Sequence, residues 1–203
     1  YLARRDSEVF GFVGCGMQAY TQFIALSTLF EIERVKVYDI NEKSARKFVE
    51  FCERSGVEAK TESIEVVCDC DVLTTTTPSR KPVVKQDWVV EGVHINAIGA
   101  DAPGKQELDE KILLRAKIVV DDIEQALHSG EINVAVGKGI LKAENIHATI
   151  GEIIVGKKSG RESEDEITIF DSTGLAIQDI STASVVYKRA VENGIGTIIK
   201  FFI

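Results

Sequence analysis

The sequence predicts an α/β fold built on a doubly wound, mostly parallel sheet. Three observations lead to this prediction. Short apolar strand patterns alternate with helix patterns along most of the 203 residues, as expected for repeated strand–helix–strand units. The connections between these patterns are short, as in sheets whose strands are joined by crossover helices. The first strand pattern also runs directly into a glycine-rich turn that opens a helix, a feature of the first unit in such sheets.

The composition is that of an ordinary globular domain. Apolar residues make up 44% of the chain and charged residues 28%, and the length suffices for one sizeable core or one domain with part of another. No apolar run approaches the ~18 residues of a membrane span, and the opening "YLARRDSE" has no signal-peptide core. A formal net charge of -8 argues against nucleic-acid binding. The four cysteines are too few and too scattered for a disulfide framework, so we expect reduced thiols and a cytoplasmic protein without a membrane or nucleic-acid partner.

The first strand–helix–strand unit is the most clearly marked. Val9–Val13 is a short apolar strand pattern, and Gln18–Phe30 carries apolar residues at helical spacing. Arg34–Tyr38 is predicted to be the second strand. Asn41–Ser55 follows as an amphipathic helix, which begins on a capping asparagine and is followed by a glycine.

The rest of the chain repeats the alternation with shorter elements. We predict strands at Val57–Lys60, Val72–Thr76, His94–Ile98, Lys117–Val120 and Ile167–Phe170. We predict helices at Ser63–Cys68, Glu107–Arg115, Ile150–Lys157 and Ala176–Glu192. Ser129–Thr149 has the least regular pattern, and the chain ends on the apolar sequence "TIIKFFI", for which we expect a strand.

The glycine turn after the first strand indicates dinucleotide binding. Gly14 permits the tight turn, Gly16 leaves room for a pyrophosphate against the backbone, and Ala19 lets the helix pack closely on the strand. The N-terminus of that helix offers free N–H groups to the phosphates. Asp39 ends the second strand, where a carboxylate accepts the ribose hydroxyls of NAD and repels the 2′-phosphate of NADP. The alternative is a tight turn without a ligand, with Asp39 only starting the next turn.

Two further strand patterns end on polar residues, and ligands of doubly wound sheets bind beyond the carboxyl ends of the strands. The sequence "VLTTTTPSRKP" supplies Thr75 and Thr77, whose hydroxyls are candidates for contact with the cofactor; the alternative is that they only fill a strand. The sequence "INAIGADAPGK" places Gly99 and Asp101 after a strand, where the carboxylate is a candidate base or ion-pair acceptor. The alternative for Asp101 is a turn cap ahead of Pro103.

A third strand pattern, in "TIFDSTGLAIQD", ends on Ser172 and Thr173 before a helix. Both are good helix caps, and both are also groups that can contact a ligand. Cys68 and Cys70 have no second Cys or His pair nearby in sequence, so we predict no metal site. The histidines are dispersed and accompany no serine or cysteine nucleophile motif.

Together, these segments resemble the ornithine cyclodeaminase/mu-crystallin family, and most closely its archaeal alanine dehydrogenases. The likeness covers nearly the whole chain and is carried by "GCGMQA", "VYDINEKSARKF", "TTTTPSRKPVVK", "HINAIGADAPGKQELD", "GEINVAV", "HATIGEI" and "GRESEDEITIFDSTGLAIQD". The resemblance implies a Rossmann NAD-binding domain, expected here over residues 1–175. It also implies that residues 176–203 form a helix and strand that return to an N-terminal domain for substrate binding and dimerisation. The opening "YLARRD" resembles the end of a helix, so we expect that domain to precede the chain.

The resemblance also assigns roles to individual residues. Asp101 matches the catalytic aspartate of the family, which handles protons on the substrate amine or on attacking water, and Thr173 lies next to the substrate. The positions that match cofactor-binding residues are Gly14, Gly16, Met17, Gln18, Asp39, Thr75, Thr77, Ile98, Gly99, Lys105 and Ser172. Met17 and Gln18 are expected to contact the pyrophosphate through their backbone N–H groups.

The resemblance implies NAD-dependent oxidative deamination of L-alanine to pyruvate and ammonia by a homodimer, without a metal ion. One alternative is an ornithine cyclodeaminase, which converts L-ornithine to L-proline with bound NAD and no net NADH. Another is an NAD(P)H-binding, crystallin-like protein without turnover, against which a carboxylate at position 101 argues mildly. Ketimine reduction is a further variant, which we expect to prefer NADPH and which Asp39 therefore disfavours.

Overall fold

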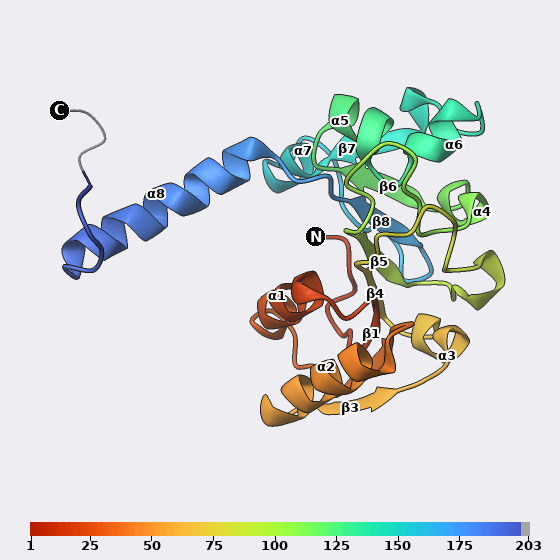
Figure 1. The fold of residues 1–203 in the computed structure, drawn as a ribbon. Helices are drawn as coiled ribbons and strands as arrows, with labels where there is room; N and C mark the ends of the chain where they lie inside the picture. The colour runs from red at the N-terminus through yellow and green to blue at the C-terminus, as the bar shows by residue number, and fades with distance from the viewer. Residues whose placement is uncertain (200–203) are drawn as a thin grey trace. The chain divides into compact units, whose positions relative to one another are not determined.

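A computed structural model describes residues 1–199 of the chain (Figure 1). Its eight strands form one sheet in the order β3-β2-β1-β4-β5-β8-β6-β7, and all neighbouring strands are parallel. The strands are β1 Val9–Val13, β2 Arg34–Tyr38, β3 Glu58–Thr61, β4 Val72–Thr75, β5 His94–Ala97, β6 Lys117–Val120, β7 Ile146–Thr149 and β8 Thr168–Asp171. The predicted doubly wound α/β fold is confirmed.

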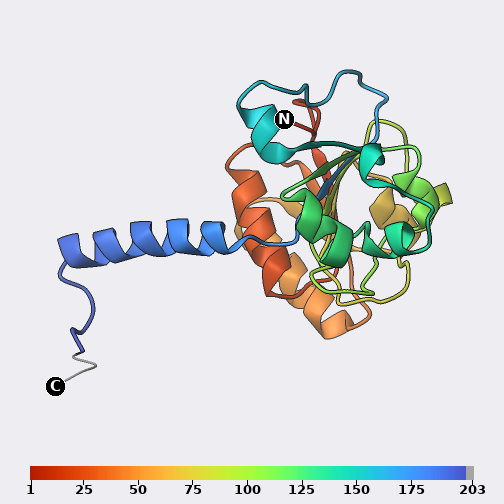
Figure 2. The ribbon, with the colours of Figure 1, turned by 90° about the horizontal axis from the view of Figure 1, so that it is seen from above.

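Helices cover both faces of this sheet (Figure 2). The helices of this part of the chain are α1 Met17–Ser27, α2 Glu42–Arg54, α3 Ile64–Cys68, α4 Glu110–Leu113, α5 Ile123–Ser129, α6 Asn133–Gly137 and α7 Ile150–Ile154, with short 3₁₀ helices at Gln86–Trp88 and Ala143–Asn145. A further helix, α8 Ala176–Glu192, belongs to a separate unit described below. Alternate strand residues point to opposite faces. Phe10 and Phe12 therefore pack with α1 and α2, whereas Val13 packs with α3 and the helices that follow on the other face.

The face that carries α1 and α2 is held by aromatic packing. Phe12 and Phe48 are fully buried, and their ring centroids lie 5.0 Å apart in an edge-to-face arrangement. Phe23 of α1 contacts both rings at 6.2–6.4 Å. Burying one such side chain contributes about 1.5–3 kcal/mol, so this cluster fixes α1, and with it the glycine turn, against the sheet.

Five strands end level with one another. The register pairs Val13 with both Tyr38 and Thr75, and continues from Thr75 to Ala97 and from Ala97 to Asp171. The residues that follow these positions therefore line one edge of the sheet. The chain leaves β1 through α1 on one face and leaves β4 towards the other face, so β1 and β4 flank the switch point where ligands of such sheets bind.

The structure differs from the sequence predictions in the second half of the sheet. The helix predicted at Glu107–Arg115 is reduced to α4, Glu110–Leu113, because the segment before Asp109 is held in an extended conformation by side chains from other elements. The stretch Ser129–Thr149, which had no regular pattern, contains α6, a 3₁₀ helix and β7. The prediction that "YLARRD" ends a helix is wrong for the described structure, since residues 1–8 contain no helix and consist of a bend, a turn and irregular segments.

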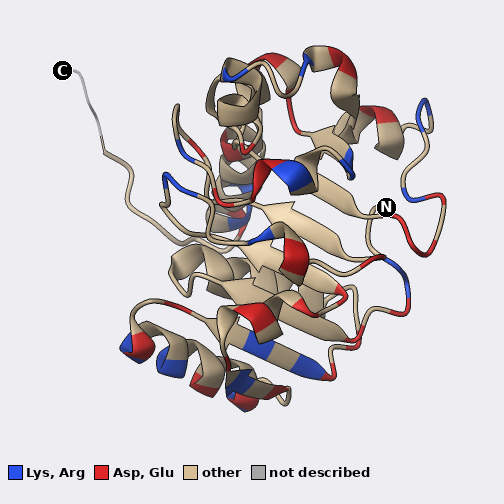
Figure 3. Cartoon of the chain, turned by 90° about the vertical axis from the view of Figure 1, so that its right-hand side faces the viewer, with Lys and Arg blue, Asp and Glu red and all other residues tan. Residues whose placement is uncertain are grey.

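The chain divides into two units, Tyr1–Thr173 and the part from Gly174 onward. The second unit contains α8, a 17-residue helix as predicted, with exposed apolar side chains that include Ile177, Ile180 and Tyr187. Residues 195–199 form no strand, and the remainder of the predicted C-terminal strand lies outside the described residues. Within residues 1–199, no helix has the length and apolar character needed to cross a membrane. Acidic and basic residues are interspersed along α2 (Figure 3).

Candidate functional site

The residues predicted from separate strand ends meet at the carboxyl edge of the sheet. Gly14 follows β1, Asp39 follows β2, Thr77 follows β4, Asp101 follows β5 and Ser172 follows β8. These five strands are adjacent, in the order β2-β1-β4-β5-β8. The edge therefore combines a glycine turn, a helix N-terminus and two carboxylates from loops far apart in sequence.

The glycine turn has room for a phosphate at one of its two glycines. Gly14 adopts φ +92°, which side-chain-bearing residues avoid, and its carbonyl accepts a hydrogen bond from the Thr76 hydroxyl at 2.9 Å. Gly16 is different, because no atom lies within 4 Å of the position that a Cβ would take. It precedes the 11-residue helix α1, whose first turn has no acidic residue and no capping side chain. No side chain caps the N–H groups at the start of α1, and the open space beside Gly16 fits a pyrophosphate there.

Asp39 joins the end of β2 to this turn. One carboxylate oxygen accepts the N–H of Cys15 and the other accepts the N–H of Asn41, both at 2.7 Å. The bond from Asn41 shows that Asp39 has the turn role that the sequence left open. The bond from Cys15 connects the carboxylate to the glycine turn. Burial, with a smaller contribution from Asp39, raises the pKa of the Cys15 thiol to about 12, so the cysteine within the turn stays neutral and is no nucleophile.

Asp101 and Lys105, both predicted site residues, form an ion pair with each other. The side chain of Asp101 is 60% exposed, whereas that of Lys105 is 20% exposed, so the carboxylate is open to a ligand while its counter-ion is covered. Asn133 anchors their loop: its side chain accepts the N–H of Gly104 at 2.9 Å and donates to the carbonyl of Lys105 at 2.9 Å. Sequence reasoning missed this role of Asn133, which lies in the segment "GEINVAV".

A second missed residue, Glu107, lies fully buried beneath the same edge. Its carboxylate accepts hydrogen bonds from the hydroxyls of Thr75 and Thr77 and from the N–H groups of Thr77 and Gly99. Burial raises its pKa, and the bonds from Thr77, Thr75 and Gly99 act in the opposite direction. No signal in the sequence marks this residue, because a glutamate in "GKQELDEK" has the pattern of an exposed helix residue.

Two more buried carboxylates, Glu131 and Asp171, extend this network, and each accepts backbone N–H groups. Glu131 accepts the N–H groups of Glu107 and Leu108, and Asp171 accepts those of Glu131 and Ile132. Burial is the main cause of the raised pKa of Asp171, which reaches about 7. Burial and the nearby Glu107 likewise raise the pKa of Glu131 well above its usual range. Each carboxylate thus fixes the backbone around the next one.

Three predicted contact residues are less accessible in the structure than the sequence suggested. Thr75 is fully buried, with its hydroxyl on Glu107 at 2.8 Å. Thr173 is 9% exposed, and its hydroxyl donates to Asp121 at 2.9 Å. Gly99 packs against protein atoms, since a Cβ there would lie 2.6 Å from the nitrogen of Thr77 and 2.7 Å from the carboxyl carbon of Glu107. Direct ligand contacts by these three residues stay predictions.

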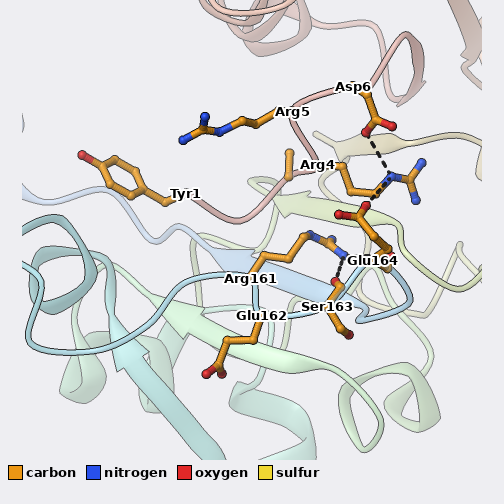
Figure 4. A pocket seen from close by; sticks show the side chains of 9 residues that line it. Tyr1, Arg4, Arg5, Asp6, Arg161, Glu162, Ser163 and Glu164 are labelled. Carbon is orange, nitrogen blue, oxygen red and sulfur yellow. Dashed lines mark hydrogen bonds and ion pairs between the residues drawn. The ribbon is translucent and has the colours of Figure 1, made fainter.

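A hollow of about 800 Å³ lies at the opposite, amino-terminal edge of the sheet (Figure 4). Two of the three arginines that line it are already engaged: Arg4 pairs with Asp71 and Glu164, and the Arg161 guanidinium donates to the carbonyls of Leu2 and Val93. Acidic side chains line it as well, so it does not resemble an anion site. Among the described residues, no group of three or more His, Cys, Asp or Glu side chains is arranged to hold a metal ion.

Comparison with known proteins identifies the family. The model of the ornithine cyclodeaminase/mu-crystallin family matches residues 1–194. The chain belongs to this family. Over its whole length it is 64% identical to an alanine dehydrogenase of Archaeoglobus fulgidus, of which it covers 63%.

Solved structures of the family agree with the fold. The chain superposes with a TM-score of 0.98 on an archaeal alanine dehydrogenase dimer with bound NAD, at 64% identity, covering all of this chain and 63% of that one. It also superposes with a TM-score of 0.94 on the Δ1-pyrroline-2-carboxylate reductase of Thermococcus litoralis in complex with NADH and L-proline, at 43% identity, covering 98% of this chain and 63% of that one. The chain therefore spans less than two thirds of these relatives.

Proposed function

We propose that this chain is the NAD-binding part of an enzyme that oxidatively deaminates L-alanine to pyruvate and ammonia and catalyses the reverse reaction. The observation that carries the proposal is 64% identity to an alanine dehydrogenase along the whole chain, joined to a glycine turn and a strand-end aspartate at the edge where ligands of this fold bind. Because the relatives are longer, the activity, the substrate and the partners of the protein are part of the proposal.

The residues at the sheet edge suit NAD. The space beside Gly16 and the free N–H groups at the start of α1 support pyrophosphate binding. Asp39 offers carboxylate oxygens to the adenosine ribose and disfavours a 2′-phosphate by charge repulsion. Further cofactor contacts are assigned to Thr77, Ile98 and the loop of Lys105, which extend along the same edge.

The proposed chemistry needs a hydride acceptor and a proton acceptor. NAD supplies the first, taking the hydride from the α-carbon of the amino acid. Asp101 is assigned the second role, because its carboxylate is exposed, lies at the sheet edge and is paired with Lys105. We assign Ser172 and Thr173, which follow β8, to contact with the cofactor and the substrate respectively.

One second candidate function has specific support. The T. litoralis relative, solved with NADH and L-proline, is 43% identical to this chain. Because that relative is in complex with NADH, the expected preference of ketimine reduction for NADPH does not exclude this reaction for a chain with Asp39. Reduction of a cyclic imino acid remains the alternative to alanine deamination.

The assembly and location belong to the proposal as well. We assign the protein a homodimeric state, supported by the dimer of the archaeal relative, with contacts from an N-terminal domain to which the segment from residue 176 onward returns. A cytoplasmic location is supported by the four cysteines, which are free and buried.

The proposal is tested in two steps. Titration of the 203-residue chain with NADH and NADPH, followed by cofactor fluorescence, should show tighter binding of NADH. The chain is then joined to the remaining part of the A. fulgidus relative, and NADH formation is measured with NAD and L-alanine. NADH oxidation with Δ1-pyrroline-2-carboxylate but no reaction with alanine would favour the reductase. Proline and ammonia from ornithine without net NADH would favour a cyclodeaminase, and binding without any turnover would favour a crystallin-like role.

A further inference from the structure

The β4 and β5 strands separate at the edge where the cofactor is proposed to bind. Their last ladder bond runs from the N–H of Ile98 to the carbonyl of Thr75, at 3.0 Å. Beyond it, the N–H groups of Thr77 and Gly99 both donate to the carboxylate of Glu107, at 2.6 Å and 2.9 Å. This carboxylate therefore replaces the sheet ladder at the point where the two strands diverge.

Glu107 also fixes the direction of two hydroxyl protons. The hydroxyls of Thr77 and Thr75 donate to opposite carboxylate oxygens, at 2.7 Å and 2.8 Å. A threonine hydroxyl has one proton, and an ionised carboxylate only accepts. Both protons are thus directed inward. Thr77, which is only partly buried, also accepts the N–H of Ser79 at 3.4 Å, so its hydroxyl keeps one oxygen lone pair and no donor for a ligand.

The backbone of Glu107 is held on both sides. Its N–H donates to the buried carboxylate of Glu131 at 2.9 Å, and its carbonyl accepts the N–H groups of Val83 and Val84 at 2.7 Å and 3.0 Å. Gly99 packs directly on the carboxyl group, since a Cβ at Gly99 would lie 2.7 Å from its carbon. The carboxylate has therefore little freedom to move.

The strand order indicates which half of a dinucleotide these loops face. Asp39 lies at the end of β2 and the phosphate space at the end of β1, whereas β4 and β5 follow on the other side of β1. If the adenosine half lies over β2, the ends of β4 and β5 face the opposite, nicotinamide half.

We propose that Glu107 is a positioning residue for the nicotinamide half of the cofactor. It holds the loops after β4 and β5 at a fixed separation and turns the Thr77 hydroxyl into an acceptor. The edge is thereby matched to a ligand group that donates a hydrogen bond, such as a carboxamide N–H or a ribose hydroxyl. This inference rests on the proposed NAD-binding function.

The test compares the affinities of NADH and ADP for the 203-residue chain, because ADP carries the adenosine half alone. In Glu107→Gln, the amide nitrogen faces the N–H of either Thr77 or Gly99, so one backbone donor loses its acceptor. We expect NADH to bind about tenfold more weakly, with the affinity for ADP unchanged. Thr75→Val, at a fully buried position whose hydroxyl donates to Glu107, should weaken NADH binding in the same direction by a smaller factor.

Asp71→Asn is the matched control. The Asp71 carboxylate also accepts two backbone N–H groups, those of Glu8 and Val9 at 3.0 Å and 2.9 Å, but at the opposite edge of the sheet. Its substitution should leave both affinities unchanged. Equal losses for NADH and ADP in Glu107→Gln and Thr75→Val, or no loss for NADH, would overturn the proposal. If circular dichroism shows that Glu107→Gln is unfolded, Thr75→Val decides. A wild-type chain that binds neither ligand overturns the NAD-binding proposal itself.

Discussion

Replacing Asp39 by asparagine tests whether this residue selects NAD. The carboxylate accepts two backbone N–H groups, of Cys15 and Asn41, at 2.7 Å each. An amide keeps one acceptor oxygen and turns its NH₂ group towards the other N–H, so one hydrogen bond is lost. Because the site is partly exposed, water replaces part of this bond, and we expect a destabilisation of about 1 kcal/mol. The fold should therefore persist.

The effect on cofactor preference follows from the lost charge. Two unit charges at about 4 Å interact with about 4 kcal/mol at an effective dielectric constant of about 20. Solvent and salt screen a partly exposed carboxylate further, so we expect NADPH to gain about 1–2 kcal/mol relative to NADH. This corresponds to about a 5- to 30-fold change in the affinity ratio.

The assay is a fluorescence titration of the wild-type and Asp39→Asn chains with NADH and NADPH at low and high salt. The ratio should shift towards NADPH in the variant, and the shift should shrink at high salt. Asp71→Asn, which alters a carboxylate of similar bonding at the other edge, should not change the ratio. An unchanged ratio in Asp39→Asn, with both cofactors still bound, would show that Asp39 only shapes the turn.

Three further predictions address the buried carboxylates and the catalytic assignment. Gly130→Ala should destabilise the fold by about 1–3 kcal/mol in urea unfolding, because the new Cβ would lie 2.7–2.8 Å from atoms of the Asp171 carboxylate, whereas Gly137→Ala, with open space around it, should not destabilise. The raised pKa of Asp171, about 7, means that its stabilising contribution is complete below the unfolded value near 3.8 and is lost as the pH rises through 7. The stability of the wild type relative to Asp171→Asn should therefore fall between pH 4 and 8. A difference in stability that stays constant over this range would mean that the Asp171 carboxylate does not titrate there. The pKa of Glu131 is raised in the same direction. Asp101→Asn should leave NADH binding by the 203-residue chain intact. In the fusion of this chain with the remaining part of the A. fulgidus relative, the same substitution should abolish most turnover. Full turnover in that fusion would remove Asp101 from the mechanism.

The sequence by itself determined the features that depend on neighbouring residues. The apolar run of β1, the glycines at positions 14 and 16, and the amphipathic pattern of α2 with its asparagine cap are all short-range signals. The polar residues at the strand ends could be predicted for the same reason, since a strand that stops at a turn marks its own carboxyl end. Because parallel strands bring these ends to one edge, the sequence also indicated that Asp39, Thr77 and Asp101 share a side of the sheet.

Only the tertiary structure decided which polar residues are buried and what they hold. Glu107 reaches its partner Thr75 across 32 positions of the chain, and Asp171 reaches the N–H of Glu131 across 40. No local pattern records such contacts, and in isolation an acidic residue in a polar segment resembles a surface residue. The same limit explains β7 and α6, which are stabilised by packing against distant parts of the sheet rather than by their own sequence pattern. The sequence thus determined at which edge of the sheet the proposed cofactor site lies. The long-range contacts determined how rigidly the loops at that edge are held.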